Sequence, residues 1–269
     1  MGKTRLDDAL VARGFFEDRA QATRACLAGA VRSRGLALTK PGQHVDPSLE
    51  LAVEAPRRYA SRGGDKLAGA LRDFSLCVDG LRCVDVGASS GGFTDCLLQQ
   101  GAASVCAVDV GYGQFDWRLR TDERVTLFER TNIRDATPLA LGAPFDLLVA
   151  DVSFTPLTPL LPVFERLVAS NKTLPAVLVL VKPQFELVKG RVPEGVVRDP
   201  QAHVDALNKV LAGLGGTGLT SQGLTFSAIK GPKGNIEFFL WAQWGGIPAT
   251  IDVEMVVQKA HEALDREPA

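Results

Sequence analysis

The stretch LRCVDVGASSGGFTD, from Leu81 to Asp95, decides the fold of this chain. It places a short apolar strand directly before a glycine-rich turn, and the turn leads into the start of a helix. Backbone amides at such a helix start can hold an anionic or polar, nucleotide-like ligand. Gly87, Gly91 and Gly92 give the spacing G-x-x-x-G-G, which differs from the G-x-G-x-x-G of a dinucleotide site, and no Lys-Ser or Lys-Thr follows as in a P-loop.

Acidic residues at the ends of two strands narrow the choice of ligand. Asp85 ends the strand before the turn, and Asp109 ends the next strand, in SVCAVDVG. An S-adenosylmethionine pocket needs such a pair, because one carboxylate sits near the amino-acid end of the ligand and the other accepts hydrogen bonds from its ribose hydroxyls. We therefore expect S-adenosylmethionine at Gly87–Gly92. The alternative is an ordinary tight turn between a strand and a helix.

The composition is that of a globular protein with room for one large domain and one small domain. The chain has 269 residues, of which 46% are hydrophobic. It shows no apolar run long enough to span a membrane and no signal-peptide pattern, so we expect a soluble cytoplasmic protein. The five cysteines form no C-x-x-C pair and there are only three histidines, so we expect reduced thiols and no metal site.

Positive charge is concentrated in the first part of the chain. Residues 1–66 contain 12 lysines and arginines against 8 acidic residues, whereas the remainder contains 18 against 23. Thr4 and Asp18 are expected to cap two short helices, followed by short strands at 30–34 and 50–54. This basic module is of a kind that binds polyanions, although a charge excess of this size is also typical of an ordinary solvated surface.

From Ser61 onward, helix and strand signals alternate, which predicts a doubly wound α/β sheet. Near-continuous apolar runs such as LLVA and AVLVLV are typical of parallel strands covered on both faces. Strands are expected at 82–86, 105–109, 125–129, 147–151 and 176–182, and helices at 65–74, 94–100, 156–169, 202–214 and 253–266. A closing antiparallel pair, at 219–229 and 236–244, completes a Rossmann-like methyltransferase sheet that is mostly parallel with an antiparallel terminal strand.

Ligands of such a sheet bind beyond the carboxyl ends of the strands, and here those ends carry charged residues. Asp151 ends the fourth strand and Lys182 the fifth, while Lys66 precedes the glycine turn by one helix and Glu237 begins the last strand. Two lysines beside two carboxylates can hold one amine in its neutral form near neutral pH. A neutral amine can then accept the proton of an alcohol that attacks a methyl sulfonium. Taken alone, Lys182 would be a lysine at a strand edge whose amine reaches water.

Two sets of motifs resemble known families. The segment RLDDALVARGFFEDRAQATRACLAGAV and the later Lys40-Pro41 pair resemble an S-four-type RNA-binding domain of a ribosomal protein, although RSRG at 32–35 replaces its usual Val-Asn-Gly hairpin. Over residues 3–245 the chain resembles the TlyA family, sometimes labelled haemolysins, in which that domain is fused to an FtsJ-like RNA ribose 2′-O-methyltransferase. The motifs are SRGGDKL (61–67), DVGASSGGFTD (85–95), DVSF (151–154), VKPQFE (181–186), EGVVRD (194–199) and KGNIEFF (233–239).

The resemblance implies a domain organisation and a catalytic tetrad. The divisions are an RNA-binding domain at 1–55, a linker at 56–62, the methyltransferase domain at 63–245 and a C-terminal helix at 246–269. In the linker, RRYA at 57–60 replaces the Arg-x-Trp-Val of mycobacterial members. The tetrad falls on Lys66, Asp151, Lys182 and Glu237. Lys182 is expected to be the base, with Asp151 and Lys66 tuning it and Glu237 orienting the group.

The binding residues and the substrate follow from the same resemblance. Together with Asp85, the cofactor contacts expected around the methionine end are Gly87, Ala88, Ser89, Gly91, Gly92 and Phe93. Asp109 would take the ribose, and Asn132 with Ile133, in TNIRD, the adenine edge. The expected RNA contacts are Arg5, Arg19, Arg24, Lys40, Arg57 and Arg58. The implied substrate is a cytidine ribose in the ribosomal RNA of ribosomal subunits.

Three other functions fit the sequence less well. A methyltransferase that acts on the amino group of a base needs Asp/Asn-Pro-Pro-Tyr/Phe at the fourth strand, whereas DVSF has no proline. A methyltransferase that acts on carbon 5 of a base needs a nucleophilic cysteine near that strand, and no cysteine follows Cys106. A non-catalytic RNA-binding or ribosome-assembly factor would not need the glycine turn and all four tetrad residues. A membrane-lysing toxin, suggested by the family label, would need a transmembrane or strongly amphipathic segment.

Overall fold

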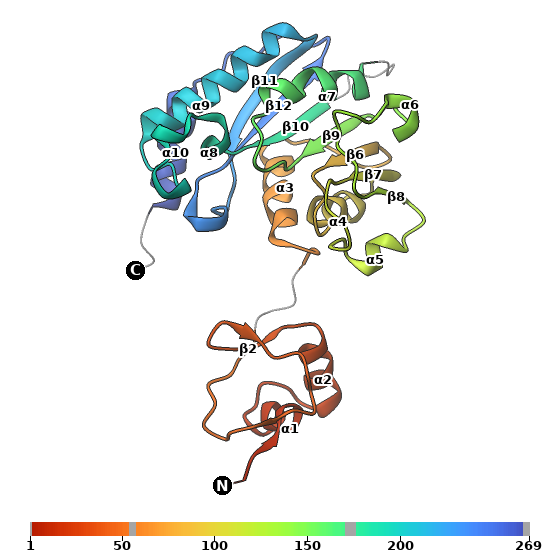
Figure 1. Ribbon diagram of the computed structural model, residues 1–269, viewed down its shortest axis with the longest axis vertical. Coiled ribbons are helices and arrows are strands. Elements are labelled where there is room, and N and C mark those ends of the chain that lie inside the picture. Colours follow the sequence, from red (N-terminus) through yellow and green to blue (C-terminus); the bar gives the residue numbers. More distant parts are fainter. Residues whose placement is uncertain (1, 54–57, 170–175, 266–269) are drawn as a thin grey trace. The chain divides into compact units, whose positions relative to one another are not determined.

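The computed structural model describes residues 2–53, 58–169 and 176–265, and its contacts divide the chain into two compact units, Met1–Arg58 and Tyr59–Ala269 (Figure 1). The small unit has one hydrophobic core, and the large unit has a core on each face of its sheet. The boundary between the units falls inside the segment 56–62, where the sequence predicts a linker.

The small unit is built from two helices and short strands. α1 (Leu6–Ala12) packs against α2 (Arg19–Leu27). β2 (Val31–Ser33) pairs in antiparallel fashion with β3 (Leu36–Ala37) and β5 (Ala52–Val53). The core consists of small and medium apolar side chains, namely Leu6, Ala9, Leu10, Ala22, Cys26, Val31, Val45 and Leu51.

The two predicted helix caps of the small unit have different outcomes. Asp18 caps α2 as predicted, because its Oδ1 accepts a hydrogen bond from the backbone N of Gln21 at 2.7 Å. The prediction that Thr4 caps the first helix is wrong. Thr4 lies in β1 (Thr4–Arg5), which pairs with β4 (His44–Val45), and this pairing keeps the chain extended up to the helix. Arg5 is the N-cap, with no side-chain capping bond in the described part of the chain.

Seven described strands form the sheet of the large unit. They are β6 (Arg82–Val86), β7 (Ser104–Val108), β8 (Val125–Phe128), β9 (Leu147–Ala150), β10 (Ala176–Val181), β11 (Leu219–Phe226) and β12 (Phe238–Trp244). Their order is β11-β12-β10-β9-β6-β7-β8. The strands from β10 to β8 pair in parallel, whereas β12 is antiparallel to both β10 and β11. The predicted mostly parallel sheet with an antiparallel closing pair is confirmed.

Helices cover both faces of this sheet (Figure 1). α3 (Arg62–Asp73) and α4 (Gly92–Gln99) pack on one face, and α7 (Leu161–Val168), α9 (Pro200–Gly213) and α10 (Val253–Leu264) on the other. Alternate strand residues supply the two cores, with Cys83, Leu147, Val149 and Leu178 on the first face and Val84, Leu148, Ala150 and Val179 on the second. The predicted C-terminal helix is thus part of the large unit, because Val257 and Ala260 of α10 are buried in its second core.

Short helices complete the connections. They are α5 (Trp117–Arg120), α6 (Pro138–Leu141), α8 (Pro183–Glu186), η1 (Thr158–Leu160), η2 (Lys189–Arg191), η3 (Pro193–Gly195), η4 (Leu214–Gly216) and η5 (Pro232–Gly234). The helix predicted at 156–169 is therefore divided into η1 and α7, a segment in which Pro159 and Pro162 cannot donate backbone hydrogen bonds. α3 begins three residues earlier than predicted, because Ser61 caps it and accepts a hydrogen bond from Gly63 N at 3.2 Å.

Three features of the described residues bear on the predicted class of protein. No helix in these ranges is long and apolar enough to cross a membrane. No group of three or more His, Cys, Asp or Glu side chains in these ranges is arranged to hold a metal ion. The five cysteines, all within these ranges, form no disulfide with one another, and four of them are buried.

Two glycines of α3 offer a test of how the segment after the linker is held. A Cβ at Gly64 would overlap the ring of the buried Tyr59, whereas a Cβ at Gly69 would lie 3.7 Å from the Ala228 Cβ, which is an ordinary contact. We expect Gly64→Ala to lower the free energy of unfolding by about 2 kcal/mol or more through overpacking. Gly69→Ala should raise it by up to about 1 kcal/mol, because alanine favours the helix.

Urea unfolding followed by tryptophan fluorescence measures both variants. All three tryptophans, Trp117, Trp241 and Trp244, lie in the large unit, so the signal reports on that unit alone. Equal stabilities of the two variants would contradict the packing of Tyr59 against α3.

Candidate active site

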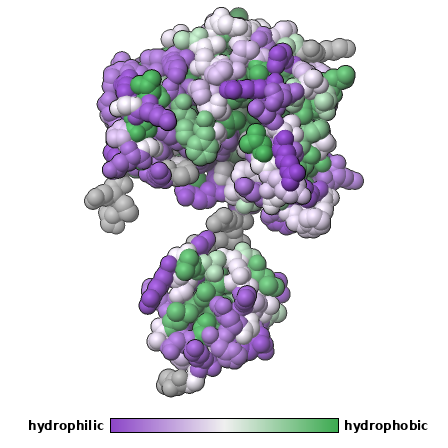
Figure 2. Space-filling model, in the orientation of Figure 1, coloured by the Kyte–Doolittle hydropathy of each residue, from purple (hydrophilic) through white to green (hydrophobic). Residues whose placement is uncertain are grey.

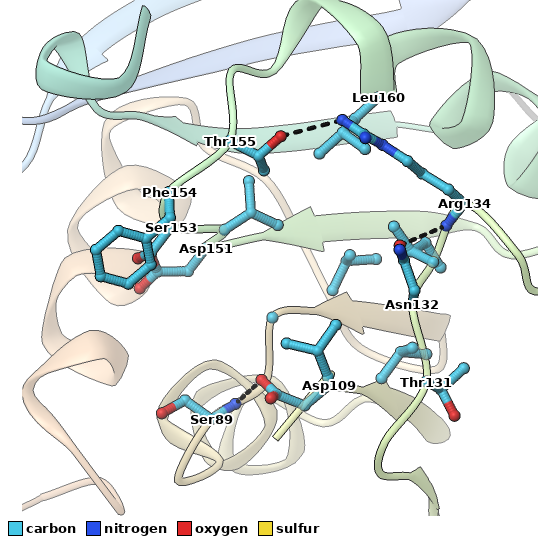
Figure 3. A pocket seen from close by; sticks show the side chains of 16 residues that line it. Ser89, Asp109, Thr131, Asn132, Arg134, Asp151, Ser153, Phe154, Thr155 and Leu160 are labelled. Carbon is cyan, nitrogen blue, oxygen red and sulfur yellow. Dashed lines mark hydrogen bonds between the residues drawn. The ribbon is translucent and has the colours of Figure 1, made fainter. Parts of the chain in front are cut away.

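A cavity of about 470 Å³ opens at the carboxyl ends of β6, β7 and β9 (Figure 3). Its walls come from the glycine turn, the loop after β7, the segment 131–134 and the loop after β9. The lining residues are Val86, Gly87, Ser89, Val108, Asp109, Val110, Thr131, Asn132, Ile133, Arg134, Asp151, Val152, Ser153, Phe154, Thr155 and Leu160. This is the edge at which open α/β sheets bind ligands, and the volume suits a nucleoside-sized molecule.

The glycine turn brings backbone to the edge of the cavity. Gly87 has a φ of +84°, and a Cβ there would lie 2.6 Å from the backbone oxygen of Asp151. Gly91 has a φ of +90°, and a Cβ there would overlap the side chain of Leu119. Both positions therefore require glycine, which keeps the turn close to the neighbouring strand end and leaves the space beside it open.

Asp109 joins the glycine turn to the loop after β7. Its Oδ2 accepts a hydrogen bond from Ser89 N at 2.7 Å (Figure 3), and its Oδ1 accepts one from Gly111 N at 2.6 Å. The carboxylate is thus held in the cavity wall, across which Asn132 and Ile133 form another part of the lining. A carboxylate fixed in this way can accept hydrogen bonds from ribose hydroxyls, and the apolar wall next to it can pack against an adenine ring. The cavity residues therefore fit the adenosine half of S-adenosylmethionine.

Asp85 is placed differently from the sequence expectation. β6 continues to Val86, so Asp85 lies inside the strand, fully buried, and is not among the residues described as lining the cavity. Thr94 donates a hydrogen bond from Oγ1 to its Oδ2 at 2.7 Å. Burial raises the pKa of the Asp85 carboxyl to about 7, against the opposing effect of Thr94. Asp85 therefore ties β6 to α4 from inside the protein, behind the cavity wall.

The remaining cofactor residues predicted from sequence support the cavity from behind. Ala88 and Phe93 are buried, and the Phe93 ring stacks on Phe239 with 6.0 Å between centroids. Gly92 packs against the cap residue Ser61, because a Cβ there would overlap the Ser61 hydroxyl. Of the predicted set, Gly87, Ser89, Asp109, Asn132 and Ile133 line the cavity itself.

The four predicted catalytic residues form two ion pairs. Lys182 Nζ lies 2.5 Å from Asp151 Oδ1, and Lys66 Nζ lies 2.5 Å from Glu237 Oε2. Lys66, Lys182 and Glu237 are buried, with 7%, 8% and 0% of their surface exposed. Burial raises the pKa of the Glu237 carboxyl, against the effect of Lys66, and both Lys182 and Asp151 act on the same carboxyl. The two pairs therefore belong to one charged site.

The structure adds neighbours to this site that were not assigned a role from the sequence. Ser153 Oγ accepts a hydrogen bond from Lys182 Nζ at 2.7 Å. Phe154 has 90% of its surface exposed, and its ring contacts Phe185 at 5.2 Å between centroids. Arg134 donates to Thr155 Oγ1 at 3.1 Å across the cavity (Figure 3). The motifs DVSF, TNIRD and VKPQFE contain Ser153, Phe154, Arg134 and Phe185, and Thr155 directly follows DVSF, so a signal for these residues was present in the sequence.

Two of the predicted RNA contacts of the small unit form ion pairs with a buried aspartate, and three others are exposed. Arg5 and Arg19 lie 2.7 Å and 3.1 Å from Oδ2 of the buried Asp7, and Arg5, then Arg19, holds the pKa of that carboxyl well below its usual range. Arg24 and Lys40 are exposed. The small unit shows a mixture of hydrophilic and apolar patches on the visible face (Figure 2). Arg58 is exposed, and Arg57 lies outside the described residues.

Comparisons with known proteins agree with this geometry. The model of the FtsJ-like methyltransferase family matches residues 59–244. YqxC of Bacillus subtilis is 44% identical over 278 residues, which cover 99% of this chain and 97% of YqxC. The 16S/23S rRNA (cytidine-2′-O)-methyltransferase TlyA of Mycobacterium tuberculosis is 46% identical over 89% of each chain. A solved structure of a Streptococcus thermophilus protein described as a hemolysin has a TM-score of 0.74 at 38% identity and covers 98% of each chain.

The buried Asp85 carboxyl predicts how stability depends on pH. Its pKa in the folded protein is about 7, above the value of 3.8 of an unperturbed aspartate, so the folded state favours the protonated form. Its contribution to stability is full below about pH 4 and falls as the pH rises to about 7, by roughly 4 kcal/mol in total. Asp85→Asn should remove this slope, so the variant gains stability over the parent chain as the pH rises from 4 to 8.

Urea unfolding at several pH values, followed by tryptophan fluorescence, measures the difference. Asp135→Asn, at an exposed position of the same unit, is the control and should keep the profile of the parent chain. Parallel profiles for the parent and Asp85→Asn would contradict the assignment.

Proposed function

Because this chain belongs to the FtsJ-like methyltransferase family, we propose that it transfers a methyl group from S-adenosylmethionine to the ribose 2′-hydroxyl of a cytidine in ribosomal RNA. The observation that carries the proposal is the pair of buried lysine–carboxylate contacts beside a nucleoside-sized cavity. The name of the M. tuberculosis relative, 46% identical, states this reaction. The proposed place of action is the cytoplasm, where ribosomal subunits are found.

The cavity residues provide the binding of the methyl donor. Asp109 would accept hydrogen bonds from the ribose hydroxyls, and Asn132 with Ile133 would hold the adenine. The backbone of the turn from Gly87 to Ser89 would face the methionine end. When bound, S-adenosylmethionine supplies a methyl group on a sulfonium sulfur, which passes to the 2′-oxygen while the carbon–sulfur electron pair stays on sulfur.

Lys182 is the proposed base of the reaction. Its Nζ, in the neutral form, accepts the proton of the 2′-hydroxyl as the oxygen attacks, and becomes an ammonium ion. Asp151, 2.5 Å away, offsets the positive charge that forms on Nζ. Glu237 orients Lys66 in the second ion pair, and its carboxylate also interacts electrostatically with Lys182. The protein otherwise contributes alignment of oxygen, methyl carbon and sulfur.

Two features support RNA as the substrate. Phe154 presents an exposed ring at the cavity, where it can stack on a base that has left its helix. The small basic unit carries exposed Arg24 and Lys40, and it can bind RNA through phosphate contacts.

Replacement of Lys182 tests the proposed chemistry. Lys182→Met keeps an unbranched side chain that is one atom shorter and has no amine, so methyl transfer should fall by about a hundredfold to ten-thousandfold. Purified ribosomal subunits incubated with tritiated S-adenosylmethionine measure the transfer. Primer extension at low nucleotide concentration should stop one nucleotide before a 2′-O-methylcytidine.

Two controls make that result interpretable. Lys259→Met, at an exposed site on α10, should retain the activity of the parent chain, and calorimetry should give Lys182→Met an unchanged affinity for S-adenosylmethionine. Label on a base would overturn the proposed substrate atom. Full activity of Lys182→Met would overturn the proposed base. A parent chain that binds no S-adenosylmethionine would favour a non-catalytic RNA-binding factor.

The exposed cations of the small unit generate a separate prediction. The double variant Arg24→Gln/Lys40→Gln should bind ribosomal RNA more weakly. The negative slope of log affinity against log salt concentration should become shallower by about one for each phosphate that the protein no longer neutralises. Filter binding over a salt series measures this. Arg24→Lys/Lys40→Arg preserves both charges and should bind as the parent chain does. An unchanged slope in the glutamine variant would place the RNA contacts elsewhere.

A further inference from the structure

The loop that follows β9, residues 151–157, provides two partners for the same amine. Asp151 lies in an ion pair with Lys182 at 2.5 Å, and Ser153, two residues further on, accepts a hydrogen bond from the Lys182 Nζ at 2.7 Å. Asp151 supplies charge, whereas Ser153 supplies a neutral oxygen with directional lone pairs. The Ser153 hydroxyl therefore affects mainly the orientation of the Lys182 amine, whereas Asp151 affects mainly its charge.

The loop adopts an unfavourable backbone conformation to place Ser153 there. Phe154, the next residue, has a φ of +64°, which is uncommon for any residue with a side chain and costs energy for a bulky one. Such strain persists only where surrounding contacts hold it. The exposed Phe154 ring buries little surface that could compensate, so the holding contacts must be sought along the loop and in the segment that faces it.

Those contacts come from the segment that carries Lys182. Phe185 contacts the Phe154 ring at 5.2 Å between centroids. Glu186, which is 3% exposed, accepts a hydrogen bond from the backbone N of Leu157 at 2.8 Å, at the far end of the loop. Lys209 of α9 donates a hydrogen bond to the backbone oxygen of Glu186 and so fixes the anchor to the rest of the unit. The loop is thus tied to residues 182–186 at its beginning, middle and end.

We propose that Ser153 is a positioning residue that aims the Lys182 amine at the substrate hydroxyl, and that Glu186 anchors the loop that carries it. This inference rests on the proposed function. A neutral amine has two N–H bonds and one lone pair. With Asp151 and Ser153 on two sides of Nζ, the remaining direction is available to the proton of the 2′-hydroxyl. Without the Ser153 hydroxyl, the amine keeps its charge partner but samples other rotations, so fewer encounters are productive.

Ser153→Ala tests the inference, and the exposed position of Ser153 means that the substitution should leave the fold intact. We expect kcat to fall about tenfold or more, while KM for RNA and the affinity for S-adenosylmethionine stay within about twofold. Ser153→Thr restores the hydroxyl and should recover most of the rate.

A spectroscopic measurement follows the same contact without any reaction. In ¹⁵N–¹H spectra of the lysine side chains, the Lys182 signal, identified by its loss in Lys182→Arg, should exchange slowly with water because its hydrogens are engaged. Ser153→Ala should speed this exchange, and Ser153→Thr should restore it. Unchanged exchange in Ser153→Ala would overturn the proposal.

The anchor is tested by a matched pair of variants at Glu186. Glu186→Gln keeps an oxygen that can accept from Leu157 N and should retain the parental kcat. Glu186→Leu removes the acceptor and should lower kcat as Ser153→Ala does. Thermal unfolding confirms that each variant is folded at the assay temperature, and if Glu186→Leu is not, the Ser153 variants alone decide.

The outcomes separate this inference from the function on which it rests. If Lys182→Met is inactive while Ser153→Ala keeps its full kcat, or changes only KM, the positioning role is wrong and the proposed function stands. If Lys182→Met is active, the proposed base is wrong, and the exchange measurement still decides whether Ser153 holds the amine.

Discussion

The ion pair between Lys182 and Asp151 depends on the parallel pairing of β9 and β10. In that ladder Val179 lies opposite Ala150, so both strands end at the same edge of the sheet and the residues that follow them meet there. Because β12 is antiparallel to β10, it is the beginning of β12 that lies at this edge. Phe238 lies opposite Val181, which brings Glu237 level with Lys182. These two registers thus assemble three of the four charged residues, and α3 supplies the fourth.

Burial determines how these charges must be arranged. A lone ammonium or carboxylate as buried as Lys66, Lys182 or Glu237 would be costly, and each of them has a partner of opposite sign. Pairing therefore explains why the charges are tolerated, and it also leaves an excess of neither sign beside the cavity. The same low exposure raises the pKa of the Glu237 carboxyl, whereas Lys66 and Lys182 oppose that rise, so both lysines act on one carboxylate. The site is consequently a network, in which the role of one residue depends on the others.

The elements that the sequence predicted well are those governed by local pattern. Apolar runs identified the strands of the large unit, and the closing antiparallel pair expected at 219–229 and 236–244 corresponds to β11 and β12. Asp18 was identified as a helix cap, because its capping bond to Gln21 is local. Thr4 was not correctly placed, because its partner strand β4 lies forty residues further along the chain. The predicted strand 82–86 has the bounds of β6, but Asp85 was expected at the ligand, whereas its side chain is buried inside the protein.

By itself, the sequence determined the class of sheet, the glycine turn and the identity of the charged residues at the strand ends, because these follow from side-chain periodicity and from the backbone freedom of glycine. Only the tertiary structure decided which lysine meets which carboxylate, that Asp85 is turned into the protein, and that Ser153 reaches Lys182. It also showed Arg5 and Arg19 engaged by Asp7. Those contacts join residues from separate elements, and their geometry is set by strand register and by the cost of burying an unpaired charge, neither of which a local pattern contains.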